Sequence, residues 1–186
     1  MDFYQQLTLW LKADPVRCQA LRQAADLELP DWCIAAGFVR NLVWDRLHDY
    51  AEPTPLADID LIYFNAEDIS EEVDRALERC LMQNSDLLWS VKNQARMHSR
   101  NGDAPYLNTL DAMSYWPELE TAIGVSLASD PVFISPFPLE NLRDLQITLN
   151  PKRPKISDFE ARVAEKKWLE IWPKLQVNRQ DYDFKE

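Results

Sequence analysis

The sequence predicts an α/β (α+β) domain in which a small mixed sheet is flanked by helices, with helices at its amino-terminal end and a helical carboxy-terminal part. Three short apolar runs, at residues 32–36, 58–64 and 87–93, have the length of strands. The segments around them carry apolar residues at three-to-four spacing, which is typical of helices with one buried side. Apolar residues make up 46% of the chain, enough for a sizeable core.

The amino-terminal quarter predicts two helices, a strand and a third helix. Asp14-Pro15 ends the helix at 2–13 and starts the next, which runs to about Leu27, because proline fits the first turn of a helix. The apolar run 32–36 is then a short buried strand. Gly37 follows it, where a strand-to-helix turn needs a residue that accepts unusual φ or lets a ligand approach.

The next segment predicts a helix, a strand, a helix and another strand. A helix at 38–49 leads through a loop into the strand 58–64, whose alternation places Asp58, Asp60 and Ile62 on one face. A helix over 66–83 then begins near Asp68 or Ser70, with Asp68 and Glu71 at capping-box spacing. We expect its acidic side chains to form a solvated face: Glu71, Glu72, Asp74 and Glu78. The strand at about 87–93 follows.

The remaining chain predicts short helices around a hairpin. A helix capped by Asn108 or Thr109 is broken at Trp116-Pro117, and a second one ends at Gly124. The expected later elements are strands at 125–128 and 132–135, a helix at 139–147, a basic linker at 150–155, a helix at 157–172 and a frayed polar tail at 176–186. The length of 186 residues fits a single domain over 1–186, with a core at about 30–100 and an extension at about 101–186.

The charge balance disfavours polyanionic partners. The chain carries 20 basic and 31 acidic residues, a net charge of −11, which repels nucleic acid and anionic lipid at long range. A small metal-chelated ligand or a basic partner is favoured instead. The three cysteines form no CxxC pair, as expected for reduced thiols in a cytoplasmic protein, and no apolar run approaches a membrane span of about 18 residues. The amino terminus does not read as a signal peptide.

Residues 37–60 combine two features that suit a metal-bound triphosphate. The helix that begins after Gly37 has free N–H groups in its first turn, which bind phosphate. Arg40 in that turn is unfavourable with the helix dipole, so we expect either an anionic ligand or an acidic surface neighbour beside it. The Cα atoms of Asp58 and Asp60 are expected to lie roughly 6–7 Å apart on one face of the strand. Paired carboxylates at this separation can hold Mg²⁺.

The stretch from Lys92 to Arg100 is the most basic one near this expected site. Its hydrogen-bonding side chains include Lys92, Asn93 and His98. In one interpretation they form a surface that contacts a phosphate or the edge of a base. In the other they belong to a solvated turn. The sequence leaves both interpretations open, and it does not place His98 near the site or away from it.

The motif Ala36-Gly37-Phe38-Val39-Arg40-Asn41, followed by Asp58-Ile59-Asp60, resembles the DNA polymerase β-like nucleotidyltransferase superfamily. The pattern is similar to that of the tRNA CCA-adding and bacterial poly(A) polymerase group. Over residues 30–145 the chain also resembles a bacterial nucleotidyltransferase-like family of this length. Ala36 stands where a glycine is usual, and Asn41 stands where an aspartate is usual.

The resemblance implies a minimal nucleotidyltransferase fold and a set of site residues. Gly37, Phe38 and Arg40, with Lys92 and Asn93, would bind the nucleoside triphosphate. Asp58 and Asp60 would be the catalytic carboxylates and would ligate Mg²⁺ or Mn²⁺. The reaction would be in-line attack of an acceptor hydroxyl on the α-phosphate.

One position departs from the superfamily pattern, which usually adds a third carboxylate on the neighbouring strand. Ser90 aligns there and cannot act as a general base, although Asp86 lies near and could substitute. Three hypotheses therefore stay open: an active nucleotidyltransferase acting on a small molecule or a protein, a nucleotide-binding regulatory protein with weak catalysis, and a purely structural or interaction protein.

Overall fold

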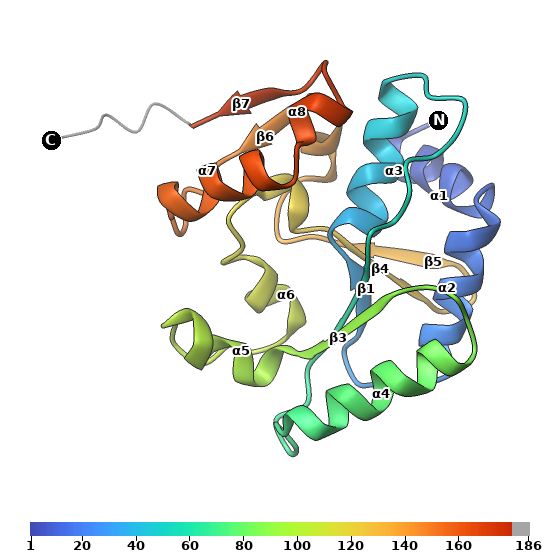
Figure 1. Ribbon diagram of the computed structural model, residues 1–186, viewed down its shortest axis with the longest axis vertical. Coiled ribbons are helices and arrows are strands. Elements are labelled where there is room, and N and C mark those ends of the chain that lie inside the picture. Colours follow the sequence, from blue (N-terminus) through green and yellow to red (C-terminus); the bar gives the residue numbers. More distant parts are fainter. Residues whose placement is uncertain (180–186) are drawn as a thin grey trace, which may run out of the picture.

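A mixed five-stranded sheet forms the centre of the protein in a computed structural model that describes residues 1–179 (Figure 1). The strand order is β3-β2-β1-β4-β5, with β1 (Cys33–Ala35) in the middle. Strand β1 is antiparallel to both β2 (Ile59–Tyr63) and β4 (Gly124–Leu127). Strand β3 (Trp89–Asn93) is parallel to β2, and β5 (Pro131–Ile134) is antiparallel to β4. The predicted mixed sheet and α/β class are confirmed.

The helices follow the predicted order in the first half of the chain. The α-helices are α1 (Phe3–Lys12), α2 (Pro15–Ala25), α3 (Gly37–Leu47), α4 (Glu71–Gln83), α5 (Gln94–Asn101), α6 (Thr109–Met113), α7 (Ile156–Glu165) and α8 (Trp168–Ile171). Two 3₁₀ helices, η1 (Leu119–Thr121) and η2 (Leu139–Arg143), lie between them. Local chemistry explains several starts: Asp2 caps α1, Asp14 caps α2 with Pro15 at its first position, and Asn108 caps α6. No helix within 1–179 has the length and apolar character needed to cross a membrane.

The two faces of the sheet pack against different parts of the chain. Ile59, Leu61 and Tyr63 of β2 point into the larger core, which also receives buried residues from α1, α2, α3 and α4. Ile62 points the other way, into a small cluster with Met113 of α6 and Ala122 after η1. The predicted period-two alternation of this strand is confirmed, and it leaves Asp60 on the face of Ile62.

The close packing of β1 against β4 depends on a glycine. Gly124 begins β4 and pairs with Ala35 of β1. A Cβ atom added at Gly124 would clash with the Cys33 side chain, at 2.4 Å from its Sγ atom and 3.0 Å from its Cβ atom. The prediction that Gly124 ends a helix is therefore wrong, because this residue is needed where two strands approach closely.

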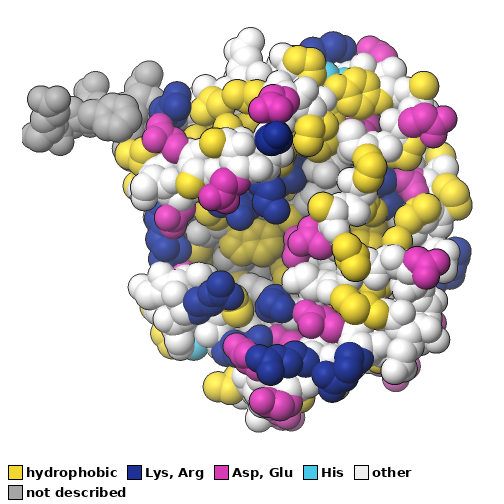
Figure 2. All heavy atoms as spheres, viewed as in Figure 1, with side chains coloured by type: hydrophobic (Ala, Val, Ile, Leu, Met, Phe, Trp, Pro, Cys, Tyr) yellow, Lys and Arg dark blue, Asp and Glu magenta, His cyan; other side chains and the backbone are white. Residues whose placement is uncertain are grey.

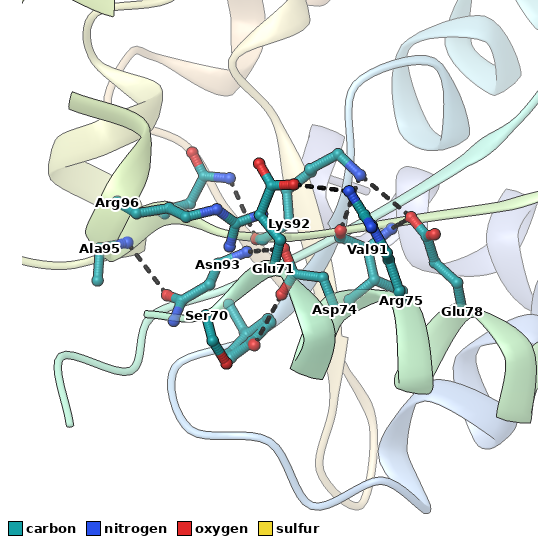
Figure 3. Close-up of polar contacts among 12 residues, drawn as sticks. Ser70, Glu71, Asp74, Arg75, Glu78, Val91, Lys92, Asn93, Ala95 and Arg96 are labelled. Atoms are coloured by element: carbon teal, nitrogen blue, oxygen red, sulfur yellow. Dashed lines mark hydrogen bonds and ion pairs between the residues drawn. The ribbon is translucent and has the colours of Figure 1, made fainter. Parts of the chain in front are cut away.

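Helix α4 is tied to β3 by carboxylates that we expected to be solvated. Asp74 is buried and accepts hydrogen bonds from the Tyr63 hydroxyl at 2.8 Å and the Asn93 N–H at 3.1 Å, and it also pairs with Arg96 (Figure 3). Glu78 accepts the Val91 N–H at 2.8 Å. The solvated-face prediction is wrong for these two residues, since they hold the carboxyl end of β3 in place.

The chain after β3 also differs from its prediction. Of the two interpretations left open for Lys92 to Arg100, the solvated turn is wrong, because helix α5 spans Gln94–Asn101, with the Asn93 side chain as its N-cap and Gly102 as its C-cap. The α4 capping box is absent as well: Ser70 is the N-cap, and Asp68 accepts hydrogen bonds from Ser70 instead. At both helix starts the observed hydrogen bonds join residues two positions apart, Asn93 with Ala95 and Asp68 with Ser70.

The carboxy-terminal part is less regular than predicted. The expected helices at 117–123 and 139–147 are only the 3₁₀ helices η1 and η2, and residues 146–148 form strand β6 (Gln146–Thr148) instead. This strand pairs in parallel with β7 (Gln176–Asn178), which lies in the expected frayed tail; residues 180–186 of that tail lie outside the described residues. Lys167, with a φ of 52°, divides the expected last helix into α7 and α8.

The sheet also reaches beyond the expected core boundary. Strands β4 and β5 come from residues 124–134, so two of the five strands belong to the segment expected to be an extension. Helices α7 and α8 and strands β6 and β7 lie together beside α3, on the side away from α4 (Figure 1). This arrangement brings Trp168 and Trp172 against Trp44 of α3.

Candidate active site

A cavity of about 460 Å³ lies between the start of α3, the loop before β2, and helices α7 and α8. We call it the α3 groove. Its lining includes Gly37, Arg40, Asp58 and Asp60. The structure thus brings together four of the residues that the sequence singled out, from two elements and the loop between them.

The start of α3 is held in an unusual conformation by Ala36. This residue has φ 57° and ψ −123°, a region that glycine adopts far more readily than alanine. Its N–H donates to the Ile123 carbonyl at 2.9 Å, and its carbonyl accepts the N–H of Arg40 at 3.0 Å. Among the described residues, the N–H groups of Gly37 and Phe38 have no hydrogen-bond acceptor, so the first turn of α3 can accept an anion.

Arg40 is buried in an aromatic cage and is not a surface ion pair. Its side chain is only 5% exposed, and its guanidinium carbon lies 4.8 Å and 4.4 Å from the ring centres of Trp44 and Trp168. It donates to the Thr121 hydroxyl at 2.6 Å, while its Nε atom has no partner. Burial lowers the pKa of Arg40 to about 10, although nearby Glu118 opposes this shift. Of the two alternatives for Arg40, the surface pair with an acidic neighbour is wrong, because the side chain is buried.

Asp58 and Asp60 occupy the edge of the groove at the start of β2. Asp58 is exposed just before the strand, and Asp60 is partly buried within it. Burial raises the pKa of the Asp60 carboxyl, and the charge of Asp58 raises it further. A hydrogen bond from Ser90 and the charge of Lys166 act in the opposite direction. The two carboxylates therefore repel each other in a way that a bound cation would relieve.

Ser90 lies directly beside Asp60, as the parallel pairing of β2 and β3 requires. The two residues are register partners, and the Ser90 hydroxyl lowers the pKa of the Asp60 carboxyl. Asp86 is exposed three residues before β3 and does not line the α3 groove. A hydroxyl thus stands where the resemblance places a third carboxylate.

Two cations from the carboxy-terminal part complete the groove. Arg162 and Lys166 of the α7 segment line it opposite the carboxylates. Arg162 is oriented by buried Glu118, whose Oε1 atom lies 2.7 Å from the Arg162 Nε atom. Neither cation belongs to a motif that the sequence indicates. Their four-residue spacing, which places them on one side of a helix, was the available signal.

The remaining predicted nucleotide contacts lie in different surroundings. The Phe38 ring is in the larger core, and Phe38 does not line the α3 groove. Asn93 is fully buried, and its side chain holds Asn65, Asp68 and Ala95. Lys92 reaches Glu78 at 3.1 Å, and His98 lines neither the groove nor the pocket described next.

A second cavity of about 330 Å³ adjoins the groove, and we call it the α5–α7 pocket. It lies between α5, the segment after α6, and α7, and Ala36, Asp60 and Arg162 line both cavities. Lysine and arginine side chains gather around the hollow on this face of the molecule (Figure 2). The overall negative charge of the chain is therefore locally reversed at the candidate site.

The oxygen atoms at Asp60 fit a hard divalent cation. Residues 1–179 contain no group of three or more acidic, histidine or cysteine side chains suited to a metal. Mg²⁺, however, is commonly held by one or two carboxylates, with phosphate oxygens and water as further ligands. Asp58 and Asp60, with the Ser90 hydroxyl beside them, supply such a set.

Comparisons with known proteins agree with this geometry. Residues 22–177 match the profile of a family described as nucleotidyltransferase. A solved NMR structure, described as revealing a CCA-adding enzyme head domain, is 32% identical with a TM-score of 0.83, and the alignment covers 94% of this chain and 96% of that one. No curated protein sequence matches the chain.

A second solved structure shares the fold at greater sequence distance. It is described as a complex of a CCA-adding enzyme with CTP, and it is 12% identical with a TM-score of 0.59. The alignment covers 96% of this chain but only 44% of that one. The described fold thus corresponds to less than half of that larger enzyme.

Proposed function

We propose that this chain, which belongs to the nucleotidyltransferase family, binds a nucleoside triphosphate in the α3 groove and transfers its nucleoside monophosphate to a hydroxyl acceptor. Membership of the family and the likeness to CCA-adding enzyme head domains support nucleotidyl transfer in general. The bound triphosphate, the metal and the acceptor are the steps that the proposal adds.

The free N–H groups at the start of α3 support binding of the β- and γ-phosphates. The N–H groups of Gly37 and Phe38 would donate to phosphate oxygens, and the helix dipole favours negative charge there. Lys166 and Arg162 would contact the phosphates from the opposite wall. The buried Arg40 would add its positive charge at the base of the groove, where its Nε donor is unpaired.

Asp58 and Asp60 would hold Mg²⁺ or Mn²⁺ together with the phosphates. When bound, such an ion supplies charge stabilisation for the attacking and leaving oxygens. The protein's own contribution is to orient the α-phosphate beside Asp60, where both cavities meet.

The reaction forms one bond and breaks one. The acceptor hydroxyl oxygen bonds to the α-phosphorus, and the bond from that phosphorus to the bridging oxygen of pyrophosphate breaks. The hydroxyl proton leaves during attack and would pass to water, because Ser90 cannot accept it. The observation that carries the proposal is the convergence of the α3 start, both aspartates and two cations on one groove.

Ser90 favours a second candidate function, that of a nucleotide-binding protein with weak catalysis. A site without a third carboxylate retains its phosphate and metal ligands but lacks a residue to accept the acceptor's proton. The two candidates therefore predict the same binding and different rates of transfer.

Titration with each nucleoside triphosphate, with and without Mg²⁺, tests the binding step. We expect backbone amide shifts at Gly37, Phe38, Asp58 and Asp60 that require the metal. If no triphosphate shifts these amides, both candidates are wrong and the motif has only a structural or interaction role.

Transfer is then measured with α-labelled triphosphate and a cell extract as the source of acceptor. Asp60→Asn should abolish labelling, whereas Asp86→Asn, at an exposed aspartate outside the groove, should not. Ser90→Asp should increase labelling if the missing carboxylate limits the rate. Binding without labelling by the parent, together with a gain in Ser90→Asp, would support the weakly catalytic protein.

A further inference from the structure

We infer that the α5–α7 pocket binds the acceptor, and that this acceptor is a small phosphorylated alcohol such as a sugar phosphate. This inference rests on the proposed function, because it names the substrate class for the same site. It commits to a small molecule where the function alone leaves the acceptor open.

The position of the pocket suits the acceptor of an in-line transfer. The pocket and the α3 groove share Ala36, Asp60 and Arg162, so a molecule in one cavity borders a molecule in the other at Asp60. With the triphosphate on the α3 side, a hydroxyl group in the pocket has access to the α-phosphorus from the side opposite the helix start. In-line displacement requires attacking and leaving oxygens on opposite sides in this way.

The lining offers hydrogen-bond donors to an anion. Four cations line the pocket, Lys92, Arg153, Lys155 and Arg162, against two carboxylates, Asp60 and Asp158. Two of these cations are oriented by buried carboxylates: Asp103 pairs with Arg153, and Glu118 pairs with Arg162. Neither of these two carboxylates lines the pocket. A ligand therefore meets the cationic side of each pair, which is the side that a phosphate group requires.

Lys155 is the cation best placed to bind the ligand. Its nearest carboxylate oxygen, on Asp158, lies 3.7 Å from the Lys155 Nζ atom, beyond the usual range of a hydrogen bond. By contrast, Arg153 and Arg162 approach their carboxylates at 2.7 Å. The ion pair of Lys155 is therefore the longest of the three, and its ammonium can turn to a phosphate at less cost than either arginine.

Volume and shape favour a small, partly apolar molecule. A cavity of about 330 Å³ is at the lower end of the size of small-molecule sites. Tyr115, Trp116 and Met97 supply apolar surface for the carbon face of a sugar. A longer polyanion would extend beyond the pocket over a chain of net charge −11, which opposes its binding.

The test follows backbone amides of the full chain during titration with matched pairs of compounds. Ribose 5-phosphate is compared with ribose, and glycerol 3-phosphate with glycerol. We expect the phosphorylated member of each pair to shift amides at Gln94, Tyr115 and Lys155, and the neutral member to bind far more weakly. Lys155→Gln should weaken phosphate-dependent binding by about tenfold, because one charge-assisted hydrogen bond is lost.

Lys167→Gln is the matched control. Lys167 is 67% exposed, and its Nζ atom lies 3.9 Å from the Glu170 carboxylate, an ion pair with the same i,i+3 spacing as Lys155 and Asp158. Lys167 does not line the α5–α7 pocket. Its replacement should leave binding unchanged. Equal weakening by the two variants would indicate a general charge effect and would overturn the inference.

Two other results would also overturn it. One is the absence of pocket shifts with every phosphorylated compound, and the other is tighter binding of a short RNA oligonucleotide than of either sugar phosphate. A nucleoside triphosphate titration in the same buffer separates the two proposals. Shifts at Gly37 and Asp58 without pocket shifts refute the acceptor site alone, whereas pocket shifts without groove shifts refute the proposed function and, with it, the acceptor role.

Discussion

At the scale of single residues, the backbone conformation of Ala36 sets the turn that leads into α3 at the candidate site. Ala36 adopts a positive φ that the resemblance assigns to a glycine, and its N–H and carbonyl are both used in hydrogen bonds. These contacts hold the alanine in a conformation that its Cβ atom disfavours. The turn therefore keeps its shape although one glycine of the motif is absent.

Ala36→Gly should leave the free energy of unfolding unchanged or raise it by up to about 1 kcal/mol. Relief of backbone strain outweighs or balances the greater entropy of glycine in the unfolded chain. The control is Ala35→Gly in β1, where φ is negative and the methyl group is buried, and this variant should lose about 1 kcal/mol or more. Urea unfolding compares the two. A clear loss of stability in Ala36→Gly would contradict the strain argument.

The two aspartates of β2 form a like-charge pair in the absence of a cation. Asp58→Asn should raise the stability of the metal-free protein by about 0.5 kcal/mol or less, since it removes repulsion at an exposed position. Mg²⁺ should then stabilise the parent more than the variant. Thermal unfolding with and without Mg²⁺ measures both effects, with Asp86→Asn as the control. A clear loss of stability would mean that Asp58 is paired within the fold.

At the scale of elements, buried carboxylates join segments that are distant in the sequence. Asp74 of α4 binds β2, β3 and α5, and Glu120 of η1 accepts the Thr148 N–H of β6 at 2.8 Å. Helical periodicity assigned the α4 carboxylates to solvent because it reports only the helix itself. The partners of these groups come from other elements, which a local pattern does not contain.

Glu120 should make the stability of the protein depend on pH. Burial raises the pKa of Glu120 from 4.5 to about 7, so between these values the folded chain keeps a proton that the unfolded chain has lost. Stability should therefore fall as pH rises through this window, by up to about 3 kcal/mol from this group, and should stay lowered above it.

Glu120→Gln should flatten that dependence, because the amide oxygen still accepts the Thr148 N–H and does not ionise. Glu140→Gln in η2, at an exposed position, is the control and should leave the dependence unchanged. Urea unfolding at pH 5 and at pH 8 compares the three proteins. A parent that is equally stable at both values would contradict the prediction.

At the scale of the whole molecule, the carboxy-terminal part completes the candidate site. Trp168 of α8 packs on Trp44 of α3 and on the Arg40 guanidinium, and Trp172 donates from its Nε1 atom to Asp45 at 2.8 Å. The same segment carries Arg162 and Lys166 into the groove. Residues 162–172 therefore cover the arginine of the motif and supply two cations to the groove that the aspartates line.

Trp168→Ala should cost about 3–5 kcal/mol of stability, because it leaves a cavity beside Trp44 and removes one wall of the Arg40 cage. Leu169→Ala, at an exposed position of the same helix, should cost much less. Chemical unfolding followed by tryptophan fluorescence measures both variants. A loss of under about 1 kcal/mol for Trp168→Ala would mean that α8 is only loosely attached to α3.

The sequence by itself determined the elements whose signals are local. Apolar runs, three-to-four spacing and cap residues predicted α1 to α4 and β1 to β3, and alternation placed Asp58 and Asp60 on one face of a strand. The motif also indicated the family, because its residues are close together in the chain. Such features depend on neighbours within one turn or one strand, which the sequence displays directly.

Only the tertiary structure decided how the second half of the chain contributes to the fold and to the candidate site. It formed 3₁₀ helices and a strand pair where helical spacing predicted helices, because pairing of β6 with β7 and burial of Glu120 depend on segments far apart in the sequence. It also enclosed Arg40 between two tryptophans and placed Arg162 and Lys166 opposite Asp60. These contacts arise from long-range packing, which no local pattern of residues records.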